Sequence, residues 1–346
     1  MMVLYMPSIT GWLAGLPRNA FDMKLLRRDI YAITLHSASK ITKEIQVYLI
    51  KGRDEHLLID IGFHSASAAD ELCAALKQLN VELKDVRLFL THLHVDHCGN
   101  AQHFAPCLKE ILASEWDGCM ITHKLNKTTA HYIRKNRLLA GIPRSVCVKL
   151  KSESEIFEGG DGVFAFTPIH AHERLRVGDY TFEVIDLAGH SPQQIGLYEI
   201  NEHFMFAADS VLNQIYPTIN FWMEEFSSMQ DNFDTLKRIC DFDCEIVYPA
   251  HYGPISDIKE RCMQTLDHHM KKGKYLLDVV KQGSGTAYDF AMRMQWGRQL
   301  NRFNQLSCPQ QWFACMELLA HLERFYHLGI LSRELIDEHW YYEMRK

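Results

Sequence analysis

The sequence predicts a mixed α/β protein that ends in a small helical domain, and two observations lead to this fold class. Between about residues 30 and 253, short apolar segments alternate with turn-forming residues, which is typical of buried β-strands. After His251 the apolar residues recur at helical spacing. We therefore expect two domains, residues 1–256 and 257–346.

The composition is that of a globular protein. Of the 346 residues, 47% are apolar and 23% are charged, which suffices for one large domain and one small domain. A net charge of −6 argues against a dedicated polyanion binder. We find no apolar run of about 18 residues, so we expect no membrane span. Ten scattered cysteines and an N-terminus unlike a signal peptide indicate reduced thiols in a cytoplasmic protein.

The first domain begins with strands and one helix. Apolar residues at helical spacing predict a helix over residues 67–79, and the residues after it predict a strand that runs directly into Thr91-His92. Several of the later predicted strands end at a histidine or an aspartate. The predicted strands are residues 30–35, 45–50, 57–60, 86–90, 182–187, 196–200, 204–207 and 245–247.

Two segments interrupt this pattern. Residues 115–143 read as a helical insertion that stops at Gly141-Ile142-Pro143, and residues 213–226 are rich in aromatic side chains. Both follow a strand end, so both are candidates for the walls of a pocket. For their individual residues we favour packing in the core.

The second domain is predicted to hold three helices and a β-ribbon. The helices are expected at residues 258–281, after a cap at Thr286, and at residues 309–328. A short tail over residues 339–344 completes a winged-helix-like arrangement.

The segment His92-Leu93-His94-Val95-Asp96-His97 follows a predicted strand and can hold two metal ions. Side chains two residues apart can converge on one ion, so His92 and His94 would bind the first metal. Asp96 and His97 would bind the second. Histidine together with carboxylate suits zinc, with iron or manganese as alternatives.

Later strand ends supply further ligands. His190 lies in a glycine-containing turn, Asp209 follows the next-but-one strand, and His251 follows the last strand. A single histidine in a turn is usually only a polar turn residue. Because all of these residues follow strands, together they predict a dinuclear site with a bridging carboxylate.

These motifs resemble the metallo-β-lactamase superfamily over about residues 28–256, and the segment Leu58-Ile59-Asp60-Ile61-Gly62 matches an earlier strand signature of that family. The resemblance implies a four-layer αββα sandwich with the metals at one edge of the two sheets. It assigns His92, His94 and His190 to the first metal. It assigns Asp96, His97 and His251 to the second, with Asp209 as the bridge and Asp60 orienting a ligand histidine.

The predicted chemistry is hydrolysis by a hydroxide bridging two divalent ions, which is deprotonated near neutral pH. Asp209 would serve catalysis as the bridging ligand. Asp96 would orient the nucleophile or deliver a proton to the leaving group. Cys98, next to His97, is read as a neighbour of the site and not as a nucleophile.

The C-terminal motifs resemble one branch of this superfamily, the glyoxalase II-like hydrolases with a winged-helix appendage, which includes the lactamase-β-like endoribonuclease of animals. They are Asp267-His268-His269, Gly285-Thr286-Ala287-Tyr288-Asp289 and Glu317-Leu318-Leu319-Ala320-His321-Leu322. Candidate substrate contacts are Tyr216, Tyr252 and one of the adjacent His268 and His269, of which His269 is the predicted contact.

The expected substrate is a small molecule, with a thioester or small acyl ester favoured. A phosphodiesterase or endoribonuclease and a lactonase are the alternatives. Residues 257–346 hold 13 Lys and Arg against 11 Asp and Glu, which disfavours nucleic acid. A non-enzymatic binding protein is disfavoured because no ligand is missing. The family and the aromatic tail suggest a homodimer.

Overall fold

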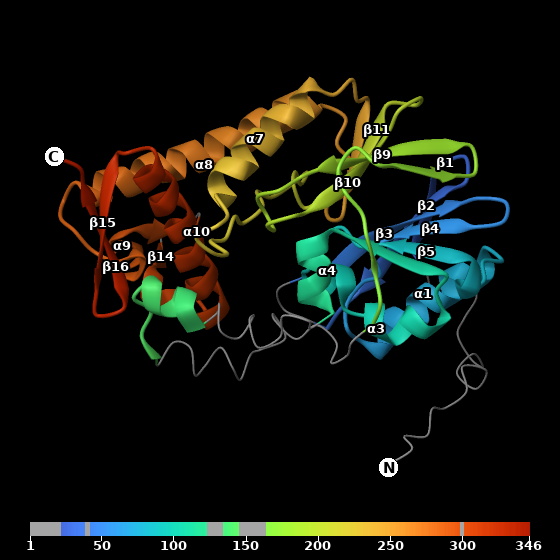
Figure 1. The fold of residues 1–346 in the computed structure, drawn as a ribbon, viewed down its shortest axis with the longest axis horizontal. Helices are drawn as coiled ribbons and strands as arrows, with labels where there is room; N and C mark the ends of the chain where they lie inside the picture. Colours follow the sequence, from blue (N-terminus) through green and yellow to red (C-terminus); the bar gives the residue numbers. More distant parts are fainter. Residues whose placement is uncertain (1–21, 39–41, 123–133, 145–163, 298–300) are drawn as a thin grey trace, which may run out of the picture.

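The computed structural model describes residues 22–38, 42–122, 134–144, 164–297 and 301–346 (Figure 1). In this part of the chain, two β-sheets form the larger domain. One sheet follows chain order: β1 (Met23–Arg27), β2 (Ile30–His36), β3 (Glu44–Lys51), β4 (His56–Ile59), β5 (Val86–Phe89), β6 (Glu110–Ala113) and β7 (Thr167–Pro168). The other has the order β12 (Ile246–Pro249), β11 (Phe204–Ala208), β10 (Ile195–Glu199), β9 (Tyr180–Asp186) and β8 (Arg174–Val177).

The two sheets pack face to face because their strands alternate between two apolar cores. In β2, Ile30 and Ala32 face the other sheet, whereas Ile33 and Leu35 face the outer helices. On β11 the large aromatic side chains point inward and the smaller apolar ones point outward, toward α7 (Ser228–Asp241). Helix α1 (Ala66–Gln78) covers the outside of the first sheet. These four layers confirm the predicted αββα sandwich.

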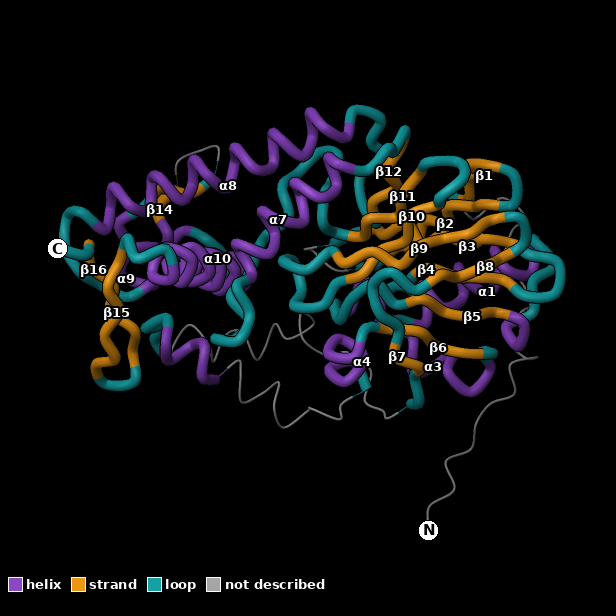
Figure 2. Tube along the Cα trace, turned by 45° about the horizontal axis from the view of Figure 1, so that its top comes forward, coloured by secondary structure: helices purple, strands orange, loops and turns teal. Residues whose placement is uncertain are grey.

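Strand direction brings the predicted ligands to one edge of the sandwich. Strands β4, β5 and β6 are parallel, so their carboxyl ends lie at the same edge of the first sheet. In the second sheet, β10 runs antiparallel to both β9 and β11, and β12 is parallel to β11. Strands β9, β11 and β12 therefore also end at a common edge (Figure 2).

The C-terminal part contains α8 (Ile258–Val280), α9 (Ala287–Arg293), α10 (Cys308–His327) and the ribbon of β15 (Leu331–Ile336) with β16 (His339–Met344). The predicted cap at Thr286 is confirmed, since its hydroxyl accepts from the Asp289 backbone N–H in a capping box. Helix α8 runs beside α7 and joins both parts of the protein (Figure 1). Its residue Cys262 packs against the second sheet, and Leu276 packs in the C-terminal core. The winged-helix assignment and the boundary at residue 256 stay predictions.

The predicted helix over residues 115–143 is not one continuous helix. Helix α4 (Glu115–Ile121) begins as expected but ends at Thr122, whose backbone N–H and hydroxyl both bond back to the Gly118 carbonyl. The next residues lie outside the described part, and residues 134–139 are helical again. Shorter elements are α2 (Val95–Cys98), α3 (Ala101–Phe104), β13 (Gln295–Trp296), β14 (Asn301–Arg302) and the 3-10 helices at Leu83–Asp85, Ala105–Cys107 and Phe303–Gln305. Among the described helices, none has the length and apolarity needed to cross a membrane.

Candidate metal centre

The seven predicted ligands meet at the carboxyl ends of four strands. The His92–His97 segment follows β5, and the short helix α2 begins within it, with His94 at its N-cap. His190, Asp209 and His251 follow β9, β11 and β12. Their metal-binding atoms form three overlapping groups, in each of which the atoms lie within 4.8 Å of one another. The structure thus brings together all seven residues that the sequence singled out.

Strained backbone holds several of these residues in place. Asp60, Ala208 and Tyr252 have φ angles of 59°, 45° and 65°, in the left-handed region that residues with side chains seldom occupy. Each is either the predicted orienting carboxylate or the direct neighbour of a predicted ligand. Gly189 has φ +136°, and a Cβ there would lie 2.6 Å from the Asn232 backbone. Such strain is typical of functional sites, where the surrounding fold over-determines the backbone.

Three imidazole nitrogens converge in the first half of the site. His94 Nδ1 lies 2.9 Å from His92 Nε2 and 2.9 Å from His190 Nε2. The opposite nitrogens of the latter two rings are donors. His190 Nδ1–H donates to the Thr218 carbonyl at 3.0 Å. His92 Nδ1–H donates to the Thr91 hydroxyl at 3.0 Å, because that hydroxyl itself donates to Asp60.

This arrangement leaves lone pairs facing one another. His92 Nε2 and His190 Nε2 both present lone pairs, and one hydrogen on His94 Nδ1 serves only one of them. Burial lowers the pKa of all three imidazoles, that of His94 to about 3, so they stay neutral near pH 7. Converging neutral imidazoles suit a divalent cation.

The second half of the site combines two histidines with two aspartates. His97 Nδ1–H donates to Asp60 at 2.7 Å, which turns Nε2 toward Asp209 at 3.6 Å. His251 Nδ1–H donates to the Glu44 carbonyl at 2.9 Å, and its Nε2 lies 3.4 Å from Asp96 and 3.7 Å from Asp209. Asp209 also lies 3.5 Å from His190 Nε2, so its carboxylate reaches both halves, as a bridging ligand must.

The carboxylates and histidines of this second half have charges that favour a bound cation. Although burial opposes it, the carboxylates of Asp209, Asp60 and Asp96 raise the pKa of His97 well above its usual value. Burial alone would raise the pKa of Asp96, but the nearby histidines His97 and His251 lower it to about 2. His97 Nε2 and Asp209 Oδ1 are buried without a hydrogen-bond partner in the described structure. Unpaired buried ligand atoms and surplus negative charge fit metal ions.

Asp117 is not among the residues that the sequence predicts for the site, although its carboxylate accepts hydrogen bonds from both loops that carry predicted ligands. Its buried carboxylate accepts from the Leu93 N–H at 3.2 Å, between two ligand histidines. It also accepts from the Ser191 hydroxyl at 3.2 Å and the Gln193 N–H at 3.1 Å, just after His190. Burial raises the pKa of Asp117 to about 7, although its hydrogen bonds lower it. No spacing motif marks this residue, because these partners come from two loops that are remote from it in the sequence.

Aromatic side chains form a wall beside the first half of the site. The Trp222 ring lies 5.8 Å from the His94 ring, and its indole N–H donates to the His190 carbonyl at 3.1 Å. Trp116 packs edge-on against Trp222 at 5.9 Å and against Phe226 at 5.4 Å. Both predicted wall segments therefore contribute to the surroundings of the metal centre. The sequence favours core packing for the individual residues of these segments, whereas Trp222 lies beside His94.

The three candidate substrate contacts lie in different environments. Tyr252 follows His251 and is 40% exposed. Tyr216 is 37% exposed and stacks on His268 at 4.1 Å. His269 is completely buried, and its neighbours are Glu317 and His321 of α10. The structure thus places His268, and not His269, beside the exposed tyrosine.

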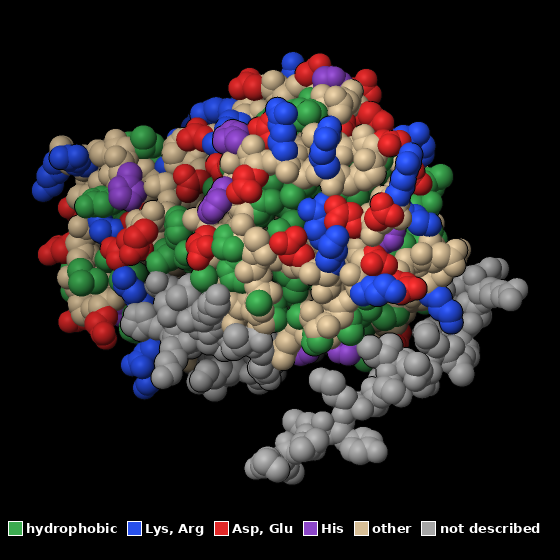
Figure 3. All heavy atoms as spheres, turned by 45° about the vertical axis from the view of Figure 1, so that its right-hand side comes forward, with side chains coloured by type: hydrophobic (Ala, Val, Ile, Leu, Met, Phe, Trp, Pro, Cys, Tyr) green, Lys and Arg blue, Asp and Glu red, His purple; other side chains and the backbone are tan. Residues whose placement is uncertain are grey.

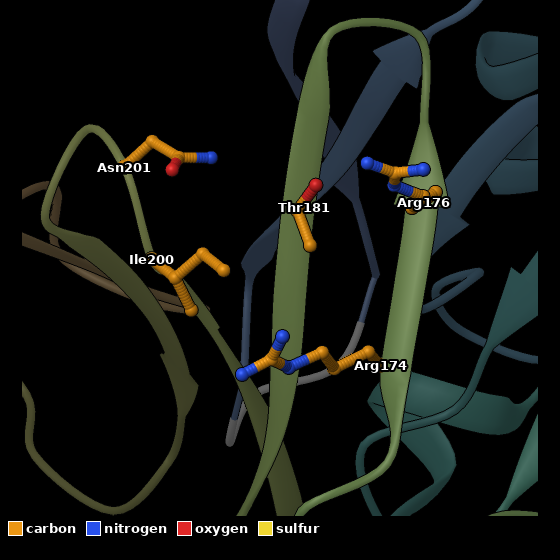
Figure 4. Close-up of a pocket in the computed structure, with 5 residues that line it drawn as sticks. All are labelled: Arg174, Arg176, Thr181, Ile200 and Asn201. Atoms are coloured by element: carbon orange, nitrogen blue, oxygen red, sulfur yellow. The ribbon is translucent and has the colours of Figure 1, made fainter.

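A shallow hollow of about 400 Å³ lies on the second sheet, lined by Arg174, Arg176, Thr181, Ile200 and Asn201 (Figure 4). Thr181 is at the start of β9, and Ile200 and Asn201 precede β11. This hollow is therefore at the opposite end of the strands from His190 and Asp209, and it is not part of the metal centre.

Cys98 is buried, and its thiol donates to the Leu93 carbonyl. Burial raises the pKa of this thiol, so it stays protonated. These facts agree with its interpretation as a neighbour of the site.

A histidine–aspartate centre at one edge of an αββα sandwich defines a class of metal-dependent hydrolases. Residues 43–251 match the metallo-beta-lactamase superfamily, and the chain belongs to that superfamily. No narrower assignment within the superfamily follows from this match.

The relatives whose names state a function are distant in sequence. The chain is 24% identical over 285 residues to the probable metallo-hydrolase YqjP of Bacillus subtilis, covering 77% of this chain and 85% of that protein. It is 23% identical to the atrochrysone carboxyl ACP thioesterase of Emericella nidulans (78% and 70% covered) and 23% identical to the acyl-coenzyme A thioesterase MBLAC2 of Gallus gallus (60% and 72% covered). The crystal structure of a metallo-beta-lactamase family protein from Thermus thermophilus shares the fold, with a TM-score of 0.74 at 22% identity, covering 93% of this chain and all of that one.

Proposed function

We propose that this protein hydrolyses thioesters or small acyl esters in the manner of glyoxalase II, with two zinc ions held by the seven-residue centre. The observation that carries the proposal is the aromatic wall: Trp222 lies against His94, with Trp116 packed behind it. An apolar wall at the metal centre suits the acyl part of a substrate, whereas a phosphodiester chain calls for cationic side chains.

The ions, when bound, would polarise the carbonyl group and lower the pKa of water. The side chains divide the other tasks. Asp96, with 16% of its side chain exposed, lies at the open side of the centre, so its carboxylate is placed to accept the proton that the attacking water loses and to pass it to a leaving thiolate. His97, by contrast, is fully buried and held by Asp60, so it serves as a fixed ligand.

Two further observations support an acyl substrate. Two of the relatives are named as thioesterases. On the face shown in Figure 3, acidic and basic side chains are interspersed and no continuous basic patch forms. Together with the near-neutral charge of residues 257–346, this favours a structural role for the C-terminal domain, which we take to be of the winged-helix kind, over nucleic-acid binding.

The test is an activity screen of the zinc-loaded protein. Hydrolysis of a panel of acyl thioesters is measured through the released thiol. A labelled single-stranded RNA and a lactone are assayed in parallel. We expect thioester turnover, abolished in Asp209→Ala and retained in Asp243→Ala, whose side chain is 91% exposed. RNA cleavage that is lost in the Asp209 variant, without thioester turnover, would refute the proposal in favour of a nuclease.

The aromatic wall has its own test. Trp222→Ala should raise KM for long acyl chains more than for acetyl, because the lost ring removes apolar contact area. Trp222→Phe keeps most of that area and should retain the preference. An equal effect on all chain lengths in both variants would show that the wall does not contact the acyl group.

A further inference from the structure

A second cluster of metal-binding side chains lies in the C-terminal part of the protein. It consists of His269 on α8 and of Glu317 and His321 on α10, whose ligand atoms lie within 4.8 Å of one another. The residues are 0%, 5% and 1% exposed. Glu317 and His321 are four residues apart on one helix, so they share a face directed at α8. The cluster shares no residue with the seven-residue centre.

The hydrogen-bond partners in this cluster are incomplete. Both nitrogens of His269 and the Nε2 atom of His321 are buried and have no hydrogen-bond partner among the described residues. His269 Nδ1 approaches Glu317 Oε1 to 3.4 Å without hydrogen-bond geometry. A buried polar atom without a hydrogen bond is costly, so three such nitrogens side by side indicate a bound group.

The neighbouring residues shape this cluster for a bound group. Lys272 donates to Glu317 Oε2 at 2.7 Å, which fixes the carboxylate and leaves Oε1 facing His269. Gly273 lets the His321 ring approach α8, since a Cβ at this position would lie 3.1 Å from His321 Nδ1. Burial lowers the pKa of His321 to about 3, so the ring keeps a free lone pair.

We propose that His269, Glu317 and His321 bind a third metal ion that joins α8 to α10. Two imidazoles and one carboxylate are a ligand set that zinc accepts, and a water molecule would complete four-coordination. Because α8 also packs on the second sheet, this ion would brace the C-terminal domain against the helix that connects it to the sandwich. The Lys272 ammonium opposes a nearby cation, so the site should bind more weakly than the seven-residue centre.

The test measures bound zinc per chain by equilibrium dialysis and mass spectrometry of the full-length protein. His321→Gln should hold one zinc fewer than the wild type. His56→Gln, which removes a buried histidine outside either cluster, should lose none. Equal zinc content in the wild type and the His321 variant would overturn the proposal. Asp209→Ala should lower zinc content independently, so failure of one site is distinguishable from failure of the other.

A second measurement does not depend on how the variants fold. Crystals of the wild-type protein equilibrated with zinc should show an anomalous-scattering peak at the zinc edge between His269, Glu317 and His321. An ordered water without anomalous signal at that position would show that the cluster is a hydrated polar core, and it would overturn the proposal. Activity enters neither readout, so this result is separate from the proposed hydrolase function.

Discussion

Replacing Asp117 tests whether the metal centre depends on a residue that binds no metal. The Asp117→Ala change removes the acceptor of four hydrogen bonds, two from backbone N–H groups and two from serine hydroxyls. The hydroxyls can rotate to other partners, whereas the N–H groups of Leu93 and Gln193 cannot. Two loops that carry predicted metal ligands then lose their common anchor.

The expected magnitude follows from these contacts. Two partly buried backbone donors without an acceptor cost about 1–3 kcal/mol each. Part of this is offset, because the variant no longer buries a carboxylate whose pKa burial raises to about 7. We therefore expect a loss of about 3 kcal/mol in the free energy of unfolding. Disordering the anchored loops should weaken zinc binding by about 10- to 100-fold, the range seen when the partners of metal ligands are removed.

The assay has two parts. Zinc affinity is measured by competition with a chromophoric chelator, and unfolding of the metal-free protein is followed in urea. Asp117→Asn is the second variant. If its amide oxygen keeps the hydrogen bond from the Leu93 N–H, its NH2 group cannot accept the hydrogen bonds from Ser191 and Gln193. Asp243→Ala again serves as the exposed control.

Unchanged zinc affinity in both Asp117 variants, with unfolding energies within about 0.5 kcal/mol of the control, would refute this reasoning. The loops would then be held by other contacts.

Three further predictions concern metal, backbone and pH. The protein with free zinc at a hundred times the Kd should have a higher free energy of unfolding in urea than the chelator-treated protein. The expected difference is about 2.7 kcal/mol per site. Gly189→Ala should be more destabilising than Gly283→Ala, because both have large positive φ but only the first Cβ meets Asn232; equal circular-dichroism melting curves would contradict this. Burial lowers the pKa of His268 to about 4, so between pH 6.5 and 4 the unfolded chain binds a proton that the folded chain does not. The free energy of unfolding should therefore fall by about 2 kcal/mol over that interval, a value discounted for the partial exposure of the ring. His268→Phe retains the stack on Tyr216 and should show a smaller pH dependence of unfolding over that interval.

Much of the candidate metal centre was predictable because its predicted ligands follow local patterns in the sequence. His92, His94, Asp96 and His97 lie within six residues, and the other ligands follow apolar segments that read as strands. The carboxyl ends of strands that run in one direction meet at one edge, so the position of each residue after its strand implies a common site. The C-terminal helices were predictable for a similar reason: apolar spacing and caps such as Thr286 are local signals.

Neighbouring histidines on α8 show where such reasoning stops. Adjacent helical residues differ in direction by about 100°, so one of His268 and His269 faces the interior and the other does not. His269 is the predicted substrate contact, but the structure buries that ring against α10 while His268 stacks on Tyr216. The choice depends on how α8 packs against α10, and no local pattern encodes that packing.

The sequence by itself predicted the ligand set of the His92–His97 centre, the order of most elements and the mixed α/β class, because strand periodicity and ligand spacing are properties of short segments. The sandwich was implied by the resemblance to the superfamily. The tertiary structure decided which distant side chains complete and cover that centre. Asp117 reaches Ser191 across 74 positions of the chain, and Trp222 lies beside His94 only because two loops fold over the same edge. Hydrogen bonds and ring contacts between remote segments depend on the packing of whole elements, so they become visible only when the chain is folded.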